Sequence, residues 1–204
     1  MNPAETLKAI ESARVVGIIR APSAAHAVEV GRALLRGGLR VIEVSFNTPD
    51  ALSAISQLIK DGEGTIGAGT VLDPADVGRV ADTGAQFMVA PNLNAEVVSA
   101  ALSADLVVAP GVFTPSEAAQ GLMLGAQLLK LFPAASAGLD MMKAISEPLP
   151  ECAWLPAGGI AFDQIPTWIQ SGATAVGMGS SLTGGDPADV ERRAKQVAGI
   201  VQGL

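Results

Sequence analysis

Short apolar runs alternate with longer segments of helical spacing along the chain, and this alternation limits the folds that the sequence can adopt. The apolar runs are Val15–Ile19, Val41–Val44, Thr65–Ala68, Phe87–Val89, Leu106–Ala109, Leu128–Phe132, Ala153–Leu155 and Ala175–Gly177. The helix-like segments are Ala24–Arg36, Asp50–Lys60, Ala75–Thr83, Ala95–Ala101, Ser116–Leu124, Leu139–Ile145, Phe162–Gln170 and Pro187–Val201. Strands that alternate with helices pair in parallel through right-handed crossovers, so we expect an α/β fold.

Turn residues flank these segments where helix ends are expected. Side chains that cap helix N-termini precede four of them, at Ser23, Thr48, Asp73 and Thr114. Glycines that permit a left-handed C-terminal cap follow others, at Gly37, Gly84, Gly125 and Gly172. The next apolar run begins soon after each glycine, which indicates short connections.

Eight strand–helix units would close a (β/α)8 barrel, the TIM-barrel fold. The 204 residues place the chain near the lower end of the size range of such barrels. We therefore predict a single domain over residues 1–204, with a core at about 15–182 and a C-terminal helix. A doubly wound open sheet is the alternative that the same alternation allows.

Composition excludes some classes of function. The formal net charge of −7 argues against a general nucleic-acid binder, although it leaves room for a small anionic substrate. No apolar stretch is long enough to suggest a membrane span. A single cysteine, Cys152, cannot form an internal disulfide, so we expect a reducing, cytoplasmic environment. His26 is the only histidine, and no metal site is predicted.

Lys130 stands out because it lies inside an apolar run. Alternate residues of a strand share a face, so Lys130 faces the same side as Leu128 and Phe132. A lysine that reaches solvent from a strand end is the ordinary explanation. Burial, however, disfavours the charged ammonium, and the free amine attacks a ketone to form a Schiff base. We therefore predict Lys130 as a nucleophile.

Glu43 and Arg20 are also in phase with inward-facing positions. Glu43 shares a face with Ser45, and Arg20 shares one with Ile18. In a barrel such residues converge at the C-terminal ends of the strands, where active sites form. Glu43 either only neutralises Lys130 or acts as the general acid–base that imine chemistry needs. Arg20 suits the binding of a carboxylate, because its guanidinium is a planar, two-pronged donor.

Two glycine-rich turns follow the last two predicted strands, at Pro156–Gly159 and Gly177–Ser181. Loops at these positions bind phosphate in many barrels through backbone N–H groups. Gly67–Thr70 resembles part of a dinucleotide-binding motif, but the third glycine is missing and no NAD site is predicted. Thr70 is in phase with Ala68, and we expect it to point inward and to hydrogen-bond a carboxylate.

Four motifs occur in an order that resembles a known family. They are Ile42–Val44, Gly67–Leu72, Leu129–Pro133 and Pro156–Ile160. The same order is found in the 2-keto-3-deoxy-6-phosphogluconate (KDPG) and -phosphogalactonate (KDPGal) aldolases. The resemblance covers nearly the whole chain, from about residue 15 to residue 182.

This resemblance implies cleavage of a phosphorylated 2-keto-3-deoxy sugar acid to pyruvate and D-glyceraldehyde 3-phosphate. It also implies class I (Schiff-base) chemistry without a metal or other cofactor, and usually a homotrimer. The Schiff-base lysine of the family matches Lys130 and its acid–base glutamate matches Glu43. The carboxylate-binding arginine matches Arg20, with Thr70 beside it. The phosphate contacts match Gly159, Gly179 and Ser180.

The two branches of the family differ in short motifs. The stretch Glu43–Pro49 resembles the galactonate branch. The gluconate branch has an arginine shortly after the matching glutamate, near the position of Asn47. Ala90–Asn92 also resembles that branch. The turn Pro156–Gly159 departs from both branches, having the proline of the gluconate branch without its threonine. The sequence therefore favours the galactonate substrate, with the gluconate as the alternative.

Two other functions remain open from sequence. One is a phosphate-binding barrel of another kind, such as an isomerase of the tryptophan pathway or a thiamine-phosphate synthase. The other is a catalytically silent barrel that binds a sugar phosphate or a protein partner. The combination of Lys130, Glu43 and Arg20 argues against both.

Overall fold

The computed structural model describes residues 1–204. Six parallel strands form its main sheet, in the order β5–β4–β3–β2–β1–β8. They are β1 (Val15–Ile19), β2 (Val41–Ser45), β3 (Thr65–Gly69), β4 (Phe87–Val89), β5 (Val107–Ala109) and β8 (Val176–Met178). From β2 to β5 each strand pairs with the one before it in sequence, and β8 pairs with β1. This order is that of a barrel, and it rules out the doubly wound alternative, in which the strand order reverses partway.

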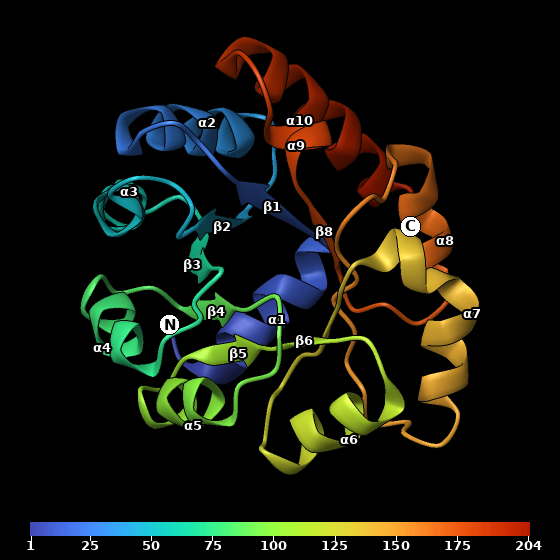
Figure 1. Cartoon of the computed structure of the whole chain (residues 1–204). Helices are drawn as coiled ribbons and strands as arrows, with labels where there is room; N and C mark the ends of the chain where they lie inside the picture. Colours follow the sequence, from blue (N-terminus) through green and yellow to red (C-terminus); the bar gives the residue numbers. More distant parts are fainter.

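Helices surround the strands on the outside (Figure 1). They are α2 (Ala24–Arg36), α3 (Ala51–Asp61), α4 (Pro74–Asp82), α5 (Ala95–Ser103), α6 (Pro115–Met123), α7 (Ala134–Ser146), η1 (Phe162–Gln164), α8 (Ile165–Gln170), α9 (Ser180–Thr183) and α10 (Pro187–Gln202). The molecule is therefore a TIM-barrel-like α/β fold, in which parallel strands alternate with an outer layer of helices.

The part of the ring between β5 and β8 has less regular pairing. Strands β6 (Gly111–Val112) and β7 (Lys130–Leu131) form a separate two-stranded parallel sheet. The predicted strand Ala153–Leu155 is reduced to single-residue bridges, in which Trp154 pairs with Leu129 and Ala173. Prolines bound this run closely on both sides, and a residue without an N–H cannot extend a strand ladder. We expected eight regular strands around the whole ring. The structure has a six-stranded parallel sheet, and the rest of the ring consists of a two-stranded sheet and isolated bridges.

Most predicted helix ends are confirmed. The side chains of Ser23, Asp73 and Thr114 cap α2, α4 and α6. Thr48 is wrong as a cap, because α3 begins only after Asp50 and the Thr48 hydroxyl instead accepts from the Ala21 N–H at 3.1 Å. The backbones of Gly84, Gly125 and Gly172 are left-handed, as expected of C-terminal caps. At the end of α2 the left-handed residue is Gly38 rather than Gly37.

Apolar side chains form two layers, one on each side of the strands. The outer layer packs strands against helices, and it includes Ile42, Val44 and Trp154. The inner layer lies inside the ring of strands and includes Val16 and Phe87. In β1, Val16 faces the inner layer and its neighbour Val15 faces the outer layer, as expected for a strand with two buried faces.

One further helix, α1 (Pro3–Ala13), was not expected from the sequence and closes one end of the ring. Its Ile10 is 1% exposed and packs among the inner-layer side chains. Figure 1 shows α1 passing behind the strands rather than beside the outer helices. Asn2 and Glu5 form a reciprocal capping box at its start, a local signal that marks a helix N-terminus.

The sequence predicts packing roles for Trp154, Trp168, Met123, Met141 and Met142. Trp154, Trp168 and Met142 are buried and Met141 packs against the core, which confirms these four. Met123 is wrong as a core residue, since it is 87% exposed at the last turn of α6. None of the helices combines the length and apolar character needed to cross a lipid bilayer.

Candidate active site

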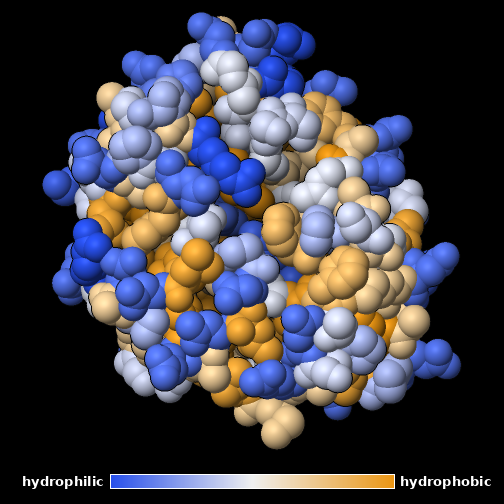
Figure 2. Space-filling view, viewed as in Figure 1, coloured by the Kyte–Doolittle hydropathy of each residue, from blue (hydrophilic) through white to orange (hydrophobic).

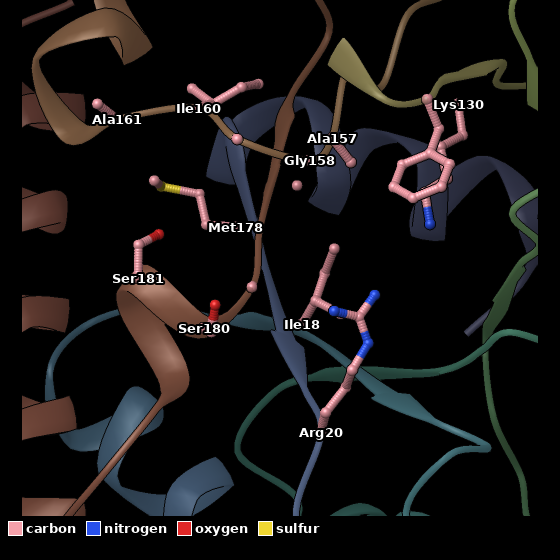
Figure 3. A pocket seen from close by; sticks show the side chains of 14 residues that line it. Ile18, Arg20, Lys130, Ala157, Gly158, Ile160, Ala161, Met178, Ser180 and Ser181 are labelled. Atoms are coloured by element: carbon pink, nitrogen blue, oxygen red, sulfur yellow. The ribbon is translucent and has the colours of Figure 1, made fainter. Parts of the chain in front are cut away.

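A cavity of ≈ 390 Å³ opens at the C-terminal ends of β1, β7 and β8 (Figure 3). Its walls come from the strand ends and from the turns that follow them. The lining residues are Ile18, Arg20, Lys130, Phe132, Ala157, Gly158, Gly159, Ile160, Ala161, Gly177, Met178, Gly179, Ser180 and Ser181. This lining brings polar donors and small residues together in one hollow, at the end where barrel enzymes bind ligands. Outside the cavity, apolar side chains gather over β4, β5 and β6, on the lower half of the face shown in Figure 2.

Lys130 lies on the inner wall of this cavity. Its neighbour Leu128 belongs to the inner apolar layer, and Leu129 and Leu131 belong to the outer layer, which confirms the predicted phase. The residue is only 3% exposed. Its Nζ lies 5.0 Å from the centroid of the Phe132 ring, within the range of a cation–π contact. The side chain is therefore held in a pocket that is apolar on one side and open on the other.

Arg20 follows β1 directly and points into the cavity. Figure 3 shows its guanidinium directed between Ser180 on one side and Lys130 on the other. The Nη1 atom is close to the backbone of the β8 turn, 3.8 Å from the place of a Cβ at Gly179. A guanidinium in this position reaches anionic groups at either end of a bound molecule.

Glu43 is 1% exposed, and its Oε2 atom has no hydrogen-bond partner. Burial raises the pKa of this carboxyl group, while the positive charges of Lys130 and Arg20 act in the opposite direction. No ion pair joins Glu43 to Lys130, because the ion pairs of the structure all involve other residues. A buried carboxyl group with a raised pKa and a free oxygen is suited to taking and returning protons.

A pair of hydroxyl groups links the end of β2 to the residue that follows β3. The Oγ atom of Ser45, which is fully buried, is 2.9 Å from Oγ1 of Thr70. The predicted phase of Thr70 is wrong, because Ala68 packs in the outer layer. Thr70 meets Ser45 because its own φ of 60° breaks the strand alternation. A β-branched residue rarely adopts this conformation, and such strain is frequent at functional sites.

The turn Pro156–Gly159 forms the wall opposite Arg20. Gly158 and Gly159 have φ values of 93° and 80°, so a glycine suits both positions. Backbone bonds fix the turn to the start of α7: Ala134 N–H donates to the Ala157 carbonyl at 2.8 Å, and Ala135 N–H donates to Gly158 at 2.9 Å. The Gly159 backbone is thereby held against the cavity.

The structure brings five of the seven predicted site residues to one cavity, namely Lys130, Arg20, Gly159, Gly179 and Ser180. Glu43 and Thr70 do not line it and lie in the adjoining cluster with Ser45. Sequence reasoning did not single out Ser45, Phe132, Met178 or Ser181. The signals for two of them were present, since Phe132 has the phase of Lys130 and Ser181 belongs to the predicted glycine-rich turn.

Known proteins of one kind match nearly the whole chain. Residues 7–196 match the family described as KDPG and KHG aldolase. The 2-dehydro-3-deoxy-6-phosphogalactonate aldolase of Escherichia coli (strain K12) is 33% identical over 191 residues, covering 92% of this chain and 93% of that protein. The KHG/KDPG aldolase of the same organism is 38% identical over 149 residues, covering 72% of this chain and 70% of that protein.

Solved structures share the fold. The KDPG aldolase of Zymomonas mobilis ZM4, determined with 3-phosphoglycerate, has a TM-score of 0.87 and 29% identity, and the match covers 96% of this chain and 94% of that one. The KDPG aldolase of Legionella pneumophila, with pyruvate captured as a covalent carbinolamine, has a TM-score of 0.84 and 29% identity over 100% and 98% of the two chains. The similarity thus extends over the whole fold and is not limited to a motif.

Proposed function

The chain belongs to the KDPG and KHG aldolase family, and we propose that this aldolase cleaves 2-dehydro-3-deoxy-6-phosphogalactonate to pyruvate and D-glyceraldehyde 3-phosphate. The observation that carries the proposal is the buried Lys130 on the wall of a cavity that also holds Arg20 and two glycine-rich turns. A substrate with a carboxylate, a ketone and a phosphate needs an arginine, a lysine amine and a phosphate-binding turn, respectively.

In the proposed mechanism Lys130 Nζ attacks the C2 ketone of the substrate. The carbinolamine that forms loses water and becomes a protonated Schiff base. A base removes the proton of the C4 hydroxyl, the C3–C4 bond breaks, and its electron pair moves to the iminium to give an enamine. Proton return to C3 and addition of water then release pyruvate and regenerate the lysine amine. The carbinolamine trapped in the Legionella relative supports the first step.

We assign the proton transfers to Glu43. Its raised pKa and its unpartnered Oε2 support this role, because a general acid–base works best when its pKa lies near the working pH. The charges of Lys130 and Arg20 act on the Glu43 carboxyl group, which supports a position near the lysine without an ion pair between the two. The structural alternative, in which Glu43 only neutralises Lys130, finds no support in an ion pair.

We assign the two anionic ends of the substrate to opposite sides of the lysine. Arg20 and the strained Thr70 would bind the carboxylate, and the Ser45 hydroxyl would orient that of Thr70. The phosphate would bind the backbone N–H groups and hydroxyl at the two turns. These phosphate contacts are Gly159, Gly179 and Ser180. The Zymomonas relative, determined with a phosphorylated ligand, supports a phosphate site in this fold.

The choice of galactonate over gluconate rests on the motif around Asn47 and on Ala90–Asn92. A KDPGal aldolase and a KHG/KDPG aldolase both have more than 30% identity to the chain, so the motif decides the proposal. Gluconate cleavage is the second candidate. Assays of both phosphorylated acids under one set of conditions test the choice.

We extend the proposal to the assembly and its setting. A closed eight-stranded barrel in one domain over residues 1–204 is supported by the bridges at Trp154 and by the bridge between Ala157 and Gly177. The family likeness also supports a homotrimer in the cytoplasm that needs no metal or other cofactor. Light scattering after size-exclusion chromatography tests the trimer.

The proposed chemistry has a direct test. Incubation with pyruvate and borohydride, followed by mass measurement, should add one reduced pyruvate to the chain and place it on Lys130. A silent sugar-phosphate-binding barrel would gain no adduct, and neither would an isomerase. The absence of an adduct under conditions in which a known class I aldolase is trapped would overturn the proposal.

A further inference from the structure

The turn Gly179–Thr183, which contains α9, is held by two sets of side-chain hydrogen bonds that its role in the cavity does not explain. Figure 3 shows Ser180 and Ser181 at the start of α9, on the cavity side. The hydroxyl of Thr183 donates to the Ile18 carbonyl at 2.7 Å and lies 3.1 Å from the Gly179 carbonyl. One anchor therefore ties the turn inward to β1.

The second anchor comes from the C-terminal helix α10, against which α9 lies (Figure 1). Arg193 Nε donates to the Leu182 carbonyl at 2.9 Å, and its Nη2 donates to the Gly184 carbonyl. The two acceptors lie at the end of α9, where helix carbonyls lack internal partners. A planar guanidinium presents two nitrogen donors to them in a fixed geometry, whereas an ammonium has a single nitrogen and no such fork.

The other cations of α10 behave differently. Arg192 pairs with Asp189 at 2.7 Å, and Lys195 pairs with Glu191 at 2.7 Å, both on the exposed surface. Such pairs contribute little to stability. Arg193 instead directs its donors at main-chain oxygens of a segment that lines the cavity from its other side.

We infer that Arg193 is a positioning residue for the phosphate side of the site. It touches neither the substrate nor the reacting atoms, and it acts by fixing the backbone of Gly179 and Ser180 from behind. The inference rests on the proposed function, because it assumes that these residues bind the phosphate of the substrate. Lys130 lies on β7 and Glu43 on β2, so pyruvate chemistry should not depend on Arg193.

The test compares Arg193→Ala with Arg192→Ala, a matched loss of charge from the next residue of the same helix. We expect Arg193→Ala to raise KM for the phosphorylated keto acid about tenfold, the scale of a lost charged hydrogen bond, with kcat unchanged. The inhibition constant of inorganic phosphate should rise in parallel. Exchange of the pyruvate methyl protons with D2O, which needs no phosphate, should match the wild type. Arg192→Ala should alter none of these.

Three results would overturn the inference. An unchanged KM and phosphate inhibition in Arg193→Ala would show that the anchor is not needed. An equal fall of cleavage and pyruvate exchange would show a general disturbance of the site. If the alanine variant folds poorly, Arg193→Lys, which keeps the charge and one donor nitrogen, serves for the same measurements. A wild-type protein that neither exchanges pyruvate protons nor cleaves either acid would overturn the proposed function itself, and the inference with it.

Discussion

Glu43 and Gly69 share one space: a Cβ atom at position 69 would lie 2.6 Å from Glu43 Cγ and would overlap the carboxyl group. The two residues are on neighbouring strands, where Gly69 pairs with Ser45, two residues beyond Glu43. The second glycine of the Gly67–Thr70 motif therefore makes room for the acid–base candidate, and this explains its place in the motif without any nucleotide.

Substitution at this position should remove activity by moving Glu43. We expect Gly69→Ala to lower the free energy of unfolding by about 1–3 kcal/mol, as overpacked cores do, and to reduce kcat sharply. Gly78→Ala is the matched control, because a Cβ there meets nothing within 4 Å and alanine favours the helix by about 1 kcal/mol. Denaturant unfolding and cleavage assays of both variants test this, and an active Gly69→Ala protein would contradict it.

Lys130→Ala should abolish cleavage while the protein still folds. The loss of a mostly aliphatic stem from the cavity wall costs some packing, but no other lysine lies on the cavity wall to form the Schiff base. Circular dichroism checks the fold, and borohydride trapping with pyruvate checks the chemistry. Substantial residual activity, or a pyruvate adduct elsewhere in the chain, would refute the assignment.

Glu43→Gln should separate proton transfer from imine formation. The amide keeps the shape of the side chain but cannot accept a proton, so borohydride should still trap pyruvate slowly. Exchange of the pyruvate methyl protons with D2O should fall by about 10²–10⁴-fold, the usual contribution of a general base. Proton NMR beside the trapping assay measures both. Normal exchange would mean that another group is the base.

The same variant should also change how stability depends on pH. Burial raises the pKa of Glu43, so folding favours the protonated form, and the stability it provides is lost as pH rises through the raised value. Glu43→Gln should therefore melt higher than the wild type at neutral and alkaline pH, and the difference should vanish near the ordinary glutamate pKa of about 4.3.

Glu117 provides a control of opposite sign. The Thr114 hydroxyl and nearby backbone N–H groups lower the pKa of its carboxyl group, so it stabilises the fold above the ordinary pKa and loses this effect as pH falls. Glu117→Gln should melt below the wild type at neutral pH. Identical pH trends for the two variants would contradict the assignment of the Glu43 shift to burial.

The branch motifs predict the preferred substrate. Because Asn47 stands near the position at which the gluconate branch has an arginine, we expect a higher kcat/KM for the phosphogalactonate than for the phosphogluconate. The two acids differ only in configuration at C4, so one coupled assay that detects pyruvate serves for both. A clear preference for the gluconate would refute the branch assignment and leave the Schiff-base chemistry intact.

The features that sequence predicted correctly depend on local periodicity. The phase of Lys130 and Arg20 follows from strand alternation, which holds wherever the backbone stays extended. Thr70 shows where this reasoning ends: Ala68, which we expected to face inward, packs in the outer layer, and a left-handed φ just beyond β3 brings Thr70 to Ser45. The glycines on both sides of Ala68 carry no apolar side chain, so the pattern of β3 did not reveal which face is the inner one.

Other features depend on partners that are distant in the sequence. Whether Ala153–Leu155 forms a strand is decided by its neighbours, and these offer it only isolated bridges. The contact of Arg193 with the carbonyls of Leu182 and Gly184 has no motif, since one side of it is backbone. By contrast, the capping box of Asn2 and Glu5 was present in the sequence and marks α1.

Helix α1 and the apolar layer above it also set an order of events in catalysis. They close one end of the ring, so whatever enters the cavity leaves through the same mouth. Lys130 is buried, whereas Ser180 is exposed, so the proposed phosphate site is nearer the mouth than the proposed Schiff-base lysine. In the proposed mechanism the aldehyde fragment then departs while pyruvate is still bonded to the lysine. The two products would therefore leave in a fixed order, with pyruvate last.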